Sequence, residues 1–148
     1  MKPILNLLYS LAFPAALLLF ASAAHADGIE PGLWKLTTWV EDDGAIDPPR
    51  YSQKCLSVEE TSDLAKTFSP VSRTVNSDCA PLEQNFSGNT LSWKLVCKGQ
   101  LNMEVTGNFA FENPRRYVAT VTNKASMGGM QMMNNKTLIE AEWVSQCR

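Results

Sequence analysis

The chain has 148 residues, with 13 Lys or Arg, 15 Asp or Glu and one His, so its formal net charge is −2 at pH 7. The basic residues form no block, which argues against nucleic acid or an anionic membrane as a partner. The length is typical of one domain with a modest core.

Residues 1–26 have the pattern of a secretory signal peptide. A single cation, Lys2, precedes an apolar run, and Ala24 and Ala26 form an A-x-A cleavage site before Asp27. The apolar run is short for a membrane span and no second one follows, so we expect no transmembrane segment after cleavage. These features predict a bacterial periplasmic or secreted location, with residues 27–148 forming a single β-rich domain.

The only histidine, His25, lies in the segment that we expect to be removed. The remaining domain therefore lacks the imidazole that His-based catalysis and His-ligated metal sites require. We expect a non-catalytic domain without a cofactor.

Alternation of apolar and polar residues predicts strands at the start of this domain. In the first strand, Trp34 and Leu36 share one face with Thr38 and Val40, and the strand ends at an acidic turn over residues 41–49. A second strand is predicted over residues 50–56.

A helix is predicted next. Ser57 and Glu60 form a capping box, and apolar residues follow at helical spacing as far as Phe68. Pro70 ends this helix, and an irregular stretch leads to Cys79.

From residue 82 the pattern is that of an antiparallel meander. Strands are predicted over residues 82–86, 90–98, 101–111, 116–126 and 131–146, with a bulge at Gly107. About seven strands and one short helix predict a mainly β fold. We expect a curved sheet or a partly closed barrel, with the helix over one end or an open side.

All four cysteines, Cys55, Cys79, Cys97 and Cys147, follow the cleavage site, and an even number in an exported chain predicts two disulfides. The parity of the last strands directs Cys97 and Cys147 into the core, which favours pairing these two and Cys55 with Cys79. Pairing of Cys79 with Cys97 across the hairpin at Gly88 remains an alternative.

A series of short motifs runs along this domain. They are Pro31-Gly32-Leu33-Trp34, Cys55-Leu56-Ser57 before an acidic helix, Ser87-Gly88-Asn89-Thr90 leading to Trp93 and Cys97, a Met/Gly-rich hairpin, and the terminal Cys147. Together they resemble a family of exported bacterial proteins catalogued only as a domain of unknown function. The resemblance implies an envelope location and a β-rich fold, and it implies no activity.

The Met/Gly-rich hairpin is the most unusual local feature. With Gly128-Gly129 as a two-residue turn, Met127 is expected opposite Met130 and Ala125 opposite Met132. This would bring Met127, Met130 and Met132 together on one face. Thioethers bind Cu(I), so copper binding is one hypothesis, and an adaptable apolar contact surface is the other.

Trp39 has the opposite parity to Trp34 and is expected on the outer face, where it is the best candidate for a ligand or partner contact. The acidic cluster from Glu41 to Asp47 does not match a calcium loop and is expected to be solvated. Arg115-Arg116 forms either a charged strand edge or an anion clamp.

The leading functional hypothesis is a domain that binds an envelope protein or a small apolar ligand, through the concave face of the sheet or the Met-rich hairpin. Periplasmic Cu(I) binding is the second hypothesis, and a carboxylate-based enzyme is the third.

Overall fold

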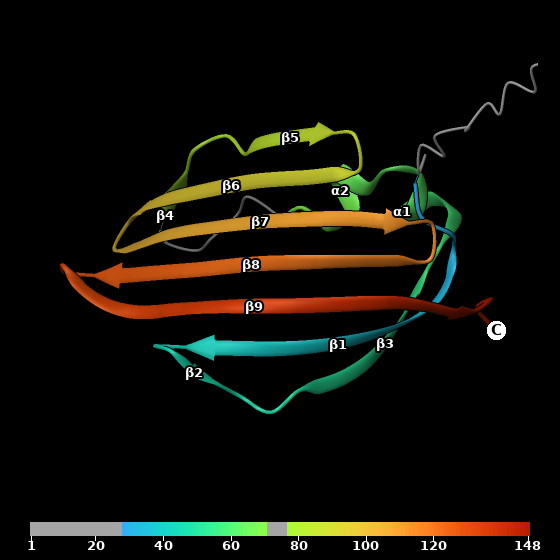
Figure 1. Ribbon diagram of the computed structural model, residues 1–148. Helices are drawn as coiled ribbons and strands as arrows, with labels where there is room; N and C mark the ends of the chain where they lie inside the picture. The colour runs from blue at the N-terminus through green and yellow to red at the C-terminus, as the bar shows by residue number, and fades with distance from the viewer. Residues whose placement is uncertain (1–27, 71–76) are drawn as a thin grey trace, which may run out of the picture.

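The computed structural model describes residues 28–70 and 77–148, so the expected signal peptide lies outside the described residues. These residues form one open antiparallel sheet of nine strands and two short helices (Figure 1). The prediction of a mainly β, curved antiparallel fold is confirmed, and the sheet is not closed into a barrel. No helix in the described ranges is long and apolar enough to span a bilayer.

The sheet contains two more strands than the sequence predicted, because two of its strands are too short to show alternation. The strands are β1 (Gly32–Asp42), β2 (Ala45–Ile46), β3 (Arg50–Leu56), β4 (Ser77–Cys79), β5 (Glu83–Ser87), β6 (Thr90–Gly99), β7 (Leu101–Asn113), β8 (Arg116–Met127) and β9 (Met130–Ser145).

The strand order is β2-β1-β9-β8-β7-β6-β4, with β3 also paired to β1 and β5 also paired to β6. Strands β6 to β9 form the predicted meander, and β9 then pairs with β1. The first and last strands of the domain are therefore neighbours inside the sheet.

The helical segment begins with the predicted capping box. The Ser57 hydroxyl accepts a hydrogen bond from the Glu60 N–H at 3.2 Å, and the Ser57 N–H donates to the Glu60 carboxylate at 2.8 Å. One helix to Phe68 was predicted, but the structure has two, α1 (Val58–Ser62) and α2 (Leu64–Phe68). Asp63 has non-helical backbone angles and caps Lys66 N–H at 2.9 Å, so it begins a second helix.

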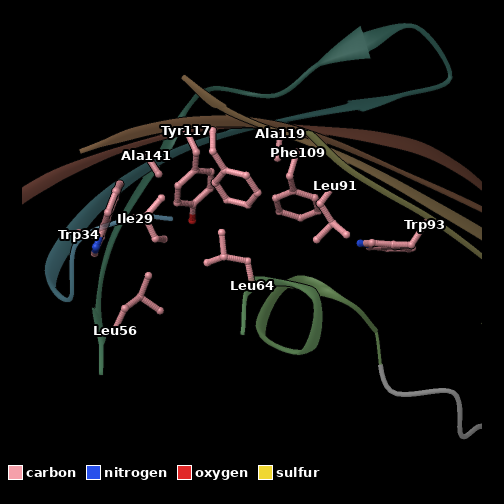
Figure 2. Close-up of a cluster of buried hydrophobic side chains, with 11 residues drawn as sticks. Ile29, Trp34, Leu56, Leu64, Leu91, Trp93, Phe109, Tyr117, Ala119 and Ala141 are labelled. Atoms are coloured by element: carbon pink, nitrogen blue, oxygen red, sulfur yellow. The ribbon is translucent and has the colours of Figure 1, made fainter. Parts of the chain in front are cut away.

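The core lies between the concave side of the sheet and the helical segment that carries Leu64 (Figure 2). Phe68 of α2 joins it to the sheet, since its ring centroid lies 5.1 Å from that of Tyr117 and 5.2 Å from that of Phe109. The buried residues of this core cluster are Ile29, Trp34, Leu56, Leu64, Leu91, Trp93, Phe109, Phe111, Tyr117, Ala119 and Ala141.

Gly107 was predicted to form a bulge, and this prediction is wrong. The register of β7 is regular through Gly107 on both sides, and the shift between β7 and β8 comes later, between Phe111 and Asn113. A Cβ at position 107 would lie only 2.8 Å from Nε1 of Trp93 and closer still to its ring carbons. Glycine is required there because the Trp93 indole lies against the backbone.

The motif Pro31-Gly32-Leu33-Trp34 also has a packing role. Gly32 has a φ of 147°, and a Cβ there would overlap the indole of Trp143. The two indoles are fixed to the chain before β1, because Trp34 Nε1 donates to the Glu30 carbonyl at 3.0 Å and Trp143 Nε1 donates to the Pro31 carbonyl at 3.1 Å. Glycine at this position thus lets β9 pack against the start of β1.

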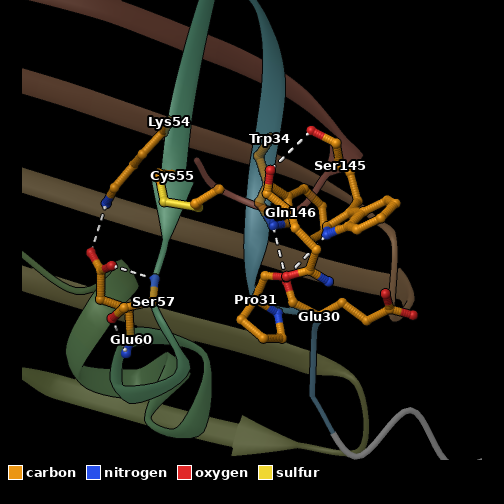
Figure 3. The surroundings of a disulfide bond; sticks show 11 residues. Glu30, Pro31, Trp34, Lys54, Cys55, Ser57, Glu60, Ser145 and Gln146 are labelled. Carbon is orange, nitrogen blue, oxygen red and sulfur yellow. Dashed lines mark hydrogen bonds and ion pairs between the residues drawn. A yellow bond between two sulfur atoms is a disulfide. The ribbon is translucent and has the colours of Figure 1, made fainter.

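The favoured disulfide pairing was wrong. The structure joins Cys55 to Cys147 (Figure 3) and Cys79 to Cys97. The alternative pairing of Cys79 with Cys97 is thus the one found, and these two residues are direct partners in the β4–β6 ladder. The prediction placed Cys147 in the core by continuing the alternation of the last strand. Strand β9 ends at Ser145, however, so the alternation does not apply to Cys147, and this residue is exposed.

Tyr117 provides a pH-dependent test of this core. Burial raises the pKa of its phenol from 10.0 to about 12. The folded state therefore keeps a proton that the unfolded chain loses, so stability is unaffected below about pH 10 and falls as the pH rises toward 12. We expect a loss of about 2 kcal/mol by about pH 11.5, relative to about pH 8.

Urea unfolding at these two pH values would measure the loss. Tyr117→Phe should remove this part of the alkaline destabilisation, whereas Tyr51→Phe, which changes an exposed tyrosine, should retain it. An equal loss in wild type and Tyr117→Phe would contradict the prediction.

Candidate functional site

The side chains that point away from the core form an apolar groove on the convex face of the sheet. The groove has a volume of about 480 Å³. Its apolar lining residues are Trp39, Ile46, Ala110, Val118, Ala119, Leu138 and Ile139, and its polar ones are Asn108, Thr120 and Glu140. We call this feature the outer-face groove.

The strand register brings these residues together. Trp39 of β1 lies opposite Leu138 of β9, and Leu138 lies opposite Thr120 of β8. One row away, Val118 of β8 lies opposite both Ala110 and Glu140. Large side chains on neighbouring strands contact each other at this spacing, so the lining forms one continuous surface across four strands.

The short strand β2 adds a wall to the groove. Ile46 lies opposite Glu41, which has the same outward parity as Trp39. Ile46 is 65% exposed and lies beside the partly buried Trp39. Adjacent exposed apolar side chains of this kind indicate a contact surface, whereas a single exposed apolar residue does not.

Arg116 stands at one end of the groove within a cluster of carboxylates. Its guanidinium lies 2.7 Å from Glu112, 2.8 Å from Glu142 and 3.5 Å from Glu140. The hydrogen bond to Glu112 raises the pKa of Arg116. One cation is thus shared by three carboxylates, and the local charge is negative.

Arg115 is also held by neighbours within the domain. It lies 2.9 Å from Glu30, and its guanidinium carbon stacks 4.5 Å from the ring centroid of Trp143. Both arginines are therefore paired with carboxylates, which argues against the anion clamp, and β8 is an interior strand, so they do not form a charged sheet edge either.

The acidic turn follows Trp39 and approaches the other end of the groove through Ile46. Asp42 and Asp43 are exposed, and Asp47 pairs with Arg50 at 3.4 Å. Across the described ranges, no group of three or more His, Cys, Asp or Glu side chains is placed to hold a metal ion.

The Met-rich hairpin differs from its predicted register. Met127 lies opposite Met130 as expected, but Ala125 lies opposite Met133 and not Met132, because a bulge shifts the register between Ala125 and Ser126. The third methionine on the sheet face that carries Ala125 and the Met127–Met130 pair is therefore Met133, and not Met132. All four methionines are exposed, from 45% for Met133 to 69% for Met130.

The structure thus places Trp39 on the outer face, as its parity predicted, and brings to it residues that the sequence did not single out. Its role as a ligand contact stays a prediction, as does that of Met127, Met130 and Met132. Near the helices, the predicted concave binding face is filled by core side chains (Figure 2). The sequence analysis did not single out four apolar residues of the groove: Ile46, Ala110, Val118 and Leu138. The one sequence signal they carry is that they are apolar at outward-facing positions, which polar residues usually occupy.

The chain belongs to the family described as "Protein of unknown function (DUF3617)", whose model matches residues 29–147. The family resemblance seen in the sequence motifs is confirmed. No curated protein and no solved structure matches the chain.

Proposed function

We propose that this protein is an exported, non-catalytic binding domain that holds a small apolar ligand in the outer-face groove. The groove itself carries the proposal, because its volume of about 480 Å³ and its mostly apolar lining are those of a small-molecule site. A few polar groups at its border, such as Asn108 and Thr120, would orient the ligand.

Export is supported by the two disulfides and by the signal-peptide pattern of residues 1–26. Disulfides persist in oxidising compartments such as the periplasm and are rare in a reducing cytosol. The pairs Cys55–Cys147 and Cys79–Cys97 include every cysteine of the chain. We propose a bacterial periplasmic or secreted location on these grounds.

A binding role is favoured over a carboxylate-based reaction by the state of the carboxylates beside the groove. Glu140 and Glu142 are both ion-paired to Arg116, so both carboxylates already belong to a surface ion-pair cluster. Cu(I) binding by the Met-rich hairpin is the second candidate, and the opposition of Met127 and Met130 is the observation that favours it.

The groove can be tested with a neutral apolar fluorophore, N-phenyl-1-naphthylamine, and a protein comprising residues 27–148. We expect saturable binding of one equivalent and a loss of affinity of about ten-fold in Trp39→Ala, because the indole forms a large part of the apolar wall. Fluorescence titration gives both the stoichiometry and the dissociation constant.

Phe86→Ala is the matched control, since Phe86 is an exposed aromatic residue on β5 and lies outside the groove lining. It should leave the affinity unchanged. Equal affinities for wild type and Trp39→Ala would show that the probe binds elsewhere and would overturn the assignment of the groove.

A further inference from the structure

The outer-face groove combines an apolar wall with one ionisable lining residue, Glu140. Glu140 lies on β9 two positions from Leu138, which is the direct partner of Trp39. The Trp39 indole and the Glu140 carboxylate therefore border the same hollow. An aromatic face next to a carboxylate is the combination that attracts alkylammonium groups, through cation–π and ionic interactions together.

The charged side chains around the groove are mostly negative, as Glu140 is. Carboxylates outnumber cations on the strand rows and turn that border it. The carboxylates are Glu41, Asp42, Asp43, Asp47, Glu112, Glu140 and Glu142, and the cations are Lys35, Arg50, Arg116 and Lys136. A surface with this surplus raises the local concentration of cations and lowers that of anions.

Arg116 does not neutralise the negative charge of Glu140. Its closest carboxylate contacts are with Glu112 and Glu142, whereas Glu140 lies farther away, at 3.5 Å. The Glu140 side chain is also 51% exposed, so a ligand can reach its carboxylate from the groove.

We propose that the groove takes a cationic amphiphile, with its apolar chain along Leu138, Val118 and Ala110 and its ammonium group between Trp39 and Glu140. This inference rests on the proposed function, because it names the chemical class of the ligand for that same groove. The apolar lining supplies affinity for the chain, and the carboxylates select the charge of the head group.

The same charges argue against a second copy of the chain as the occupant of the groove. Two convex faces packed together would bring two carboxylate-rich borders into contact, and like charges brought together at an interface oppose association. An amphiphile with an anionic head would meet the same repulsion.

The experiment compares three ligands that share one alkyl chain and differ in the head group: octyltrimethylammonium, octyl glucoside and octyl sulfate. Each competes with N-phenyl-1-naphthylamine below its micelle concentration, and circular dichroism confirms that the protein stays folded. We expect the cation to bind about ten-fold more tightly than the neutral ligand, with the anion weakest, and we expect salt to reduce this preference.

Glu140→Gln should abolish most of the preference for the cation and leave the affinity for octyl glucoside unchanged, because the amide keeps the shape and removes the charge. Glu83→Gln, on the β5 edge, is the matched control and should bind all three ligands as wild type does. Equal affinities for the three head groups, or no effect of Glu140→Gln, would overturn this inference while leaving the groove as an apolar site. Failure of the neutral fluorophore to bind at all would overturn the proposed function and this inference together.

Discussion

Replacing Trp93 with Ala is expected to lower the free energy of unfolding by about 3–5 kcal/mol, the usual cost of removing a buried Trp side chain. Trp93 is 6% exposed, and its ring centroid lies 6.4 Å from that of Phe109. Its Nε1–H donates to the Phe68 carbonyl at 2.9 Å. The substitution would leave a cavity against Gly107 and remove the hydrogen bond that ties the end of α2 to the sheet.

The loss of unfolding free energy in Trp93→Ala is to be compared with that in Trp39→Ala. Trp39 lies on the opposite face of the sheet, is only partly buried and lines an open groove, so its loss should cost less than about 1 kcal/mol. Urea unfolding followed by far-ultraviolet circular dichroism measures both variants without relying on indole fluorescence. Comparable losses would contradict the assignment of the two residues to inner and outer faces.

The fold could be predicted from the sequence where a local pattern determines it. The alternation in β6 predicted the burial of Leu91, Trp93, Leu95 and Cys97, and the capping box at Ser57 predicted the start of α1. In both cases the physical cause lies within a few consecutive residues. The helix break at Asp63 was missed because the apolar spacing continues through it.

The features that could not be predicted depend on contacts between distant segments. Strand β4 has only three residues and is identified as a strand by its pairing with β6. Pairing of Cys55 with Cys147 depends on where β9 ends beside β1.

The candidate site was missed for the same reason. The outer-face groove requires the register of β1, β7, β8 and β9 at once, and no single strand reveals it. The bulge near Ser126, which places Met133 rather than Met132 opposite Ala125, likewise has no signal in the sequence. A one-residue shift of register moves a side chain to the other face, so such errors are decisive for a proposed site.

Removing the Cys55–Cys147 disulfide is expected to cost about 4–5 kcal/mol. The bond joins residues 92 positions apart, and closing so long a loop strongly restricts the unfolded chain. The Cys79–Cys97 bond spans 18 positions, for which the same loop model gives about 3 kcal/mol. The longer bond should therefore contribute more, although it lies at the surface.

The double variant Cys55→Ala/Cys147→Ala tests this directly. Both side chains are exposed, so their replacement removes the cross-link without creating a cavity, whereas Cys97 is buried and its loss would add a packing cost. Urea unfolding of oxidised wild type and oxidised variant gives the difference, and peptide mapping without reduction should find Cys79 joined to Cys97 in the variant. A difference below about 1 kcal/mol would show that the unfolded chain is not restricted by this bond as the loop model requires. The expected size follows from the topology, because the bond joins the end of β3 to the chain just beyond β9, and these two strands flank β1.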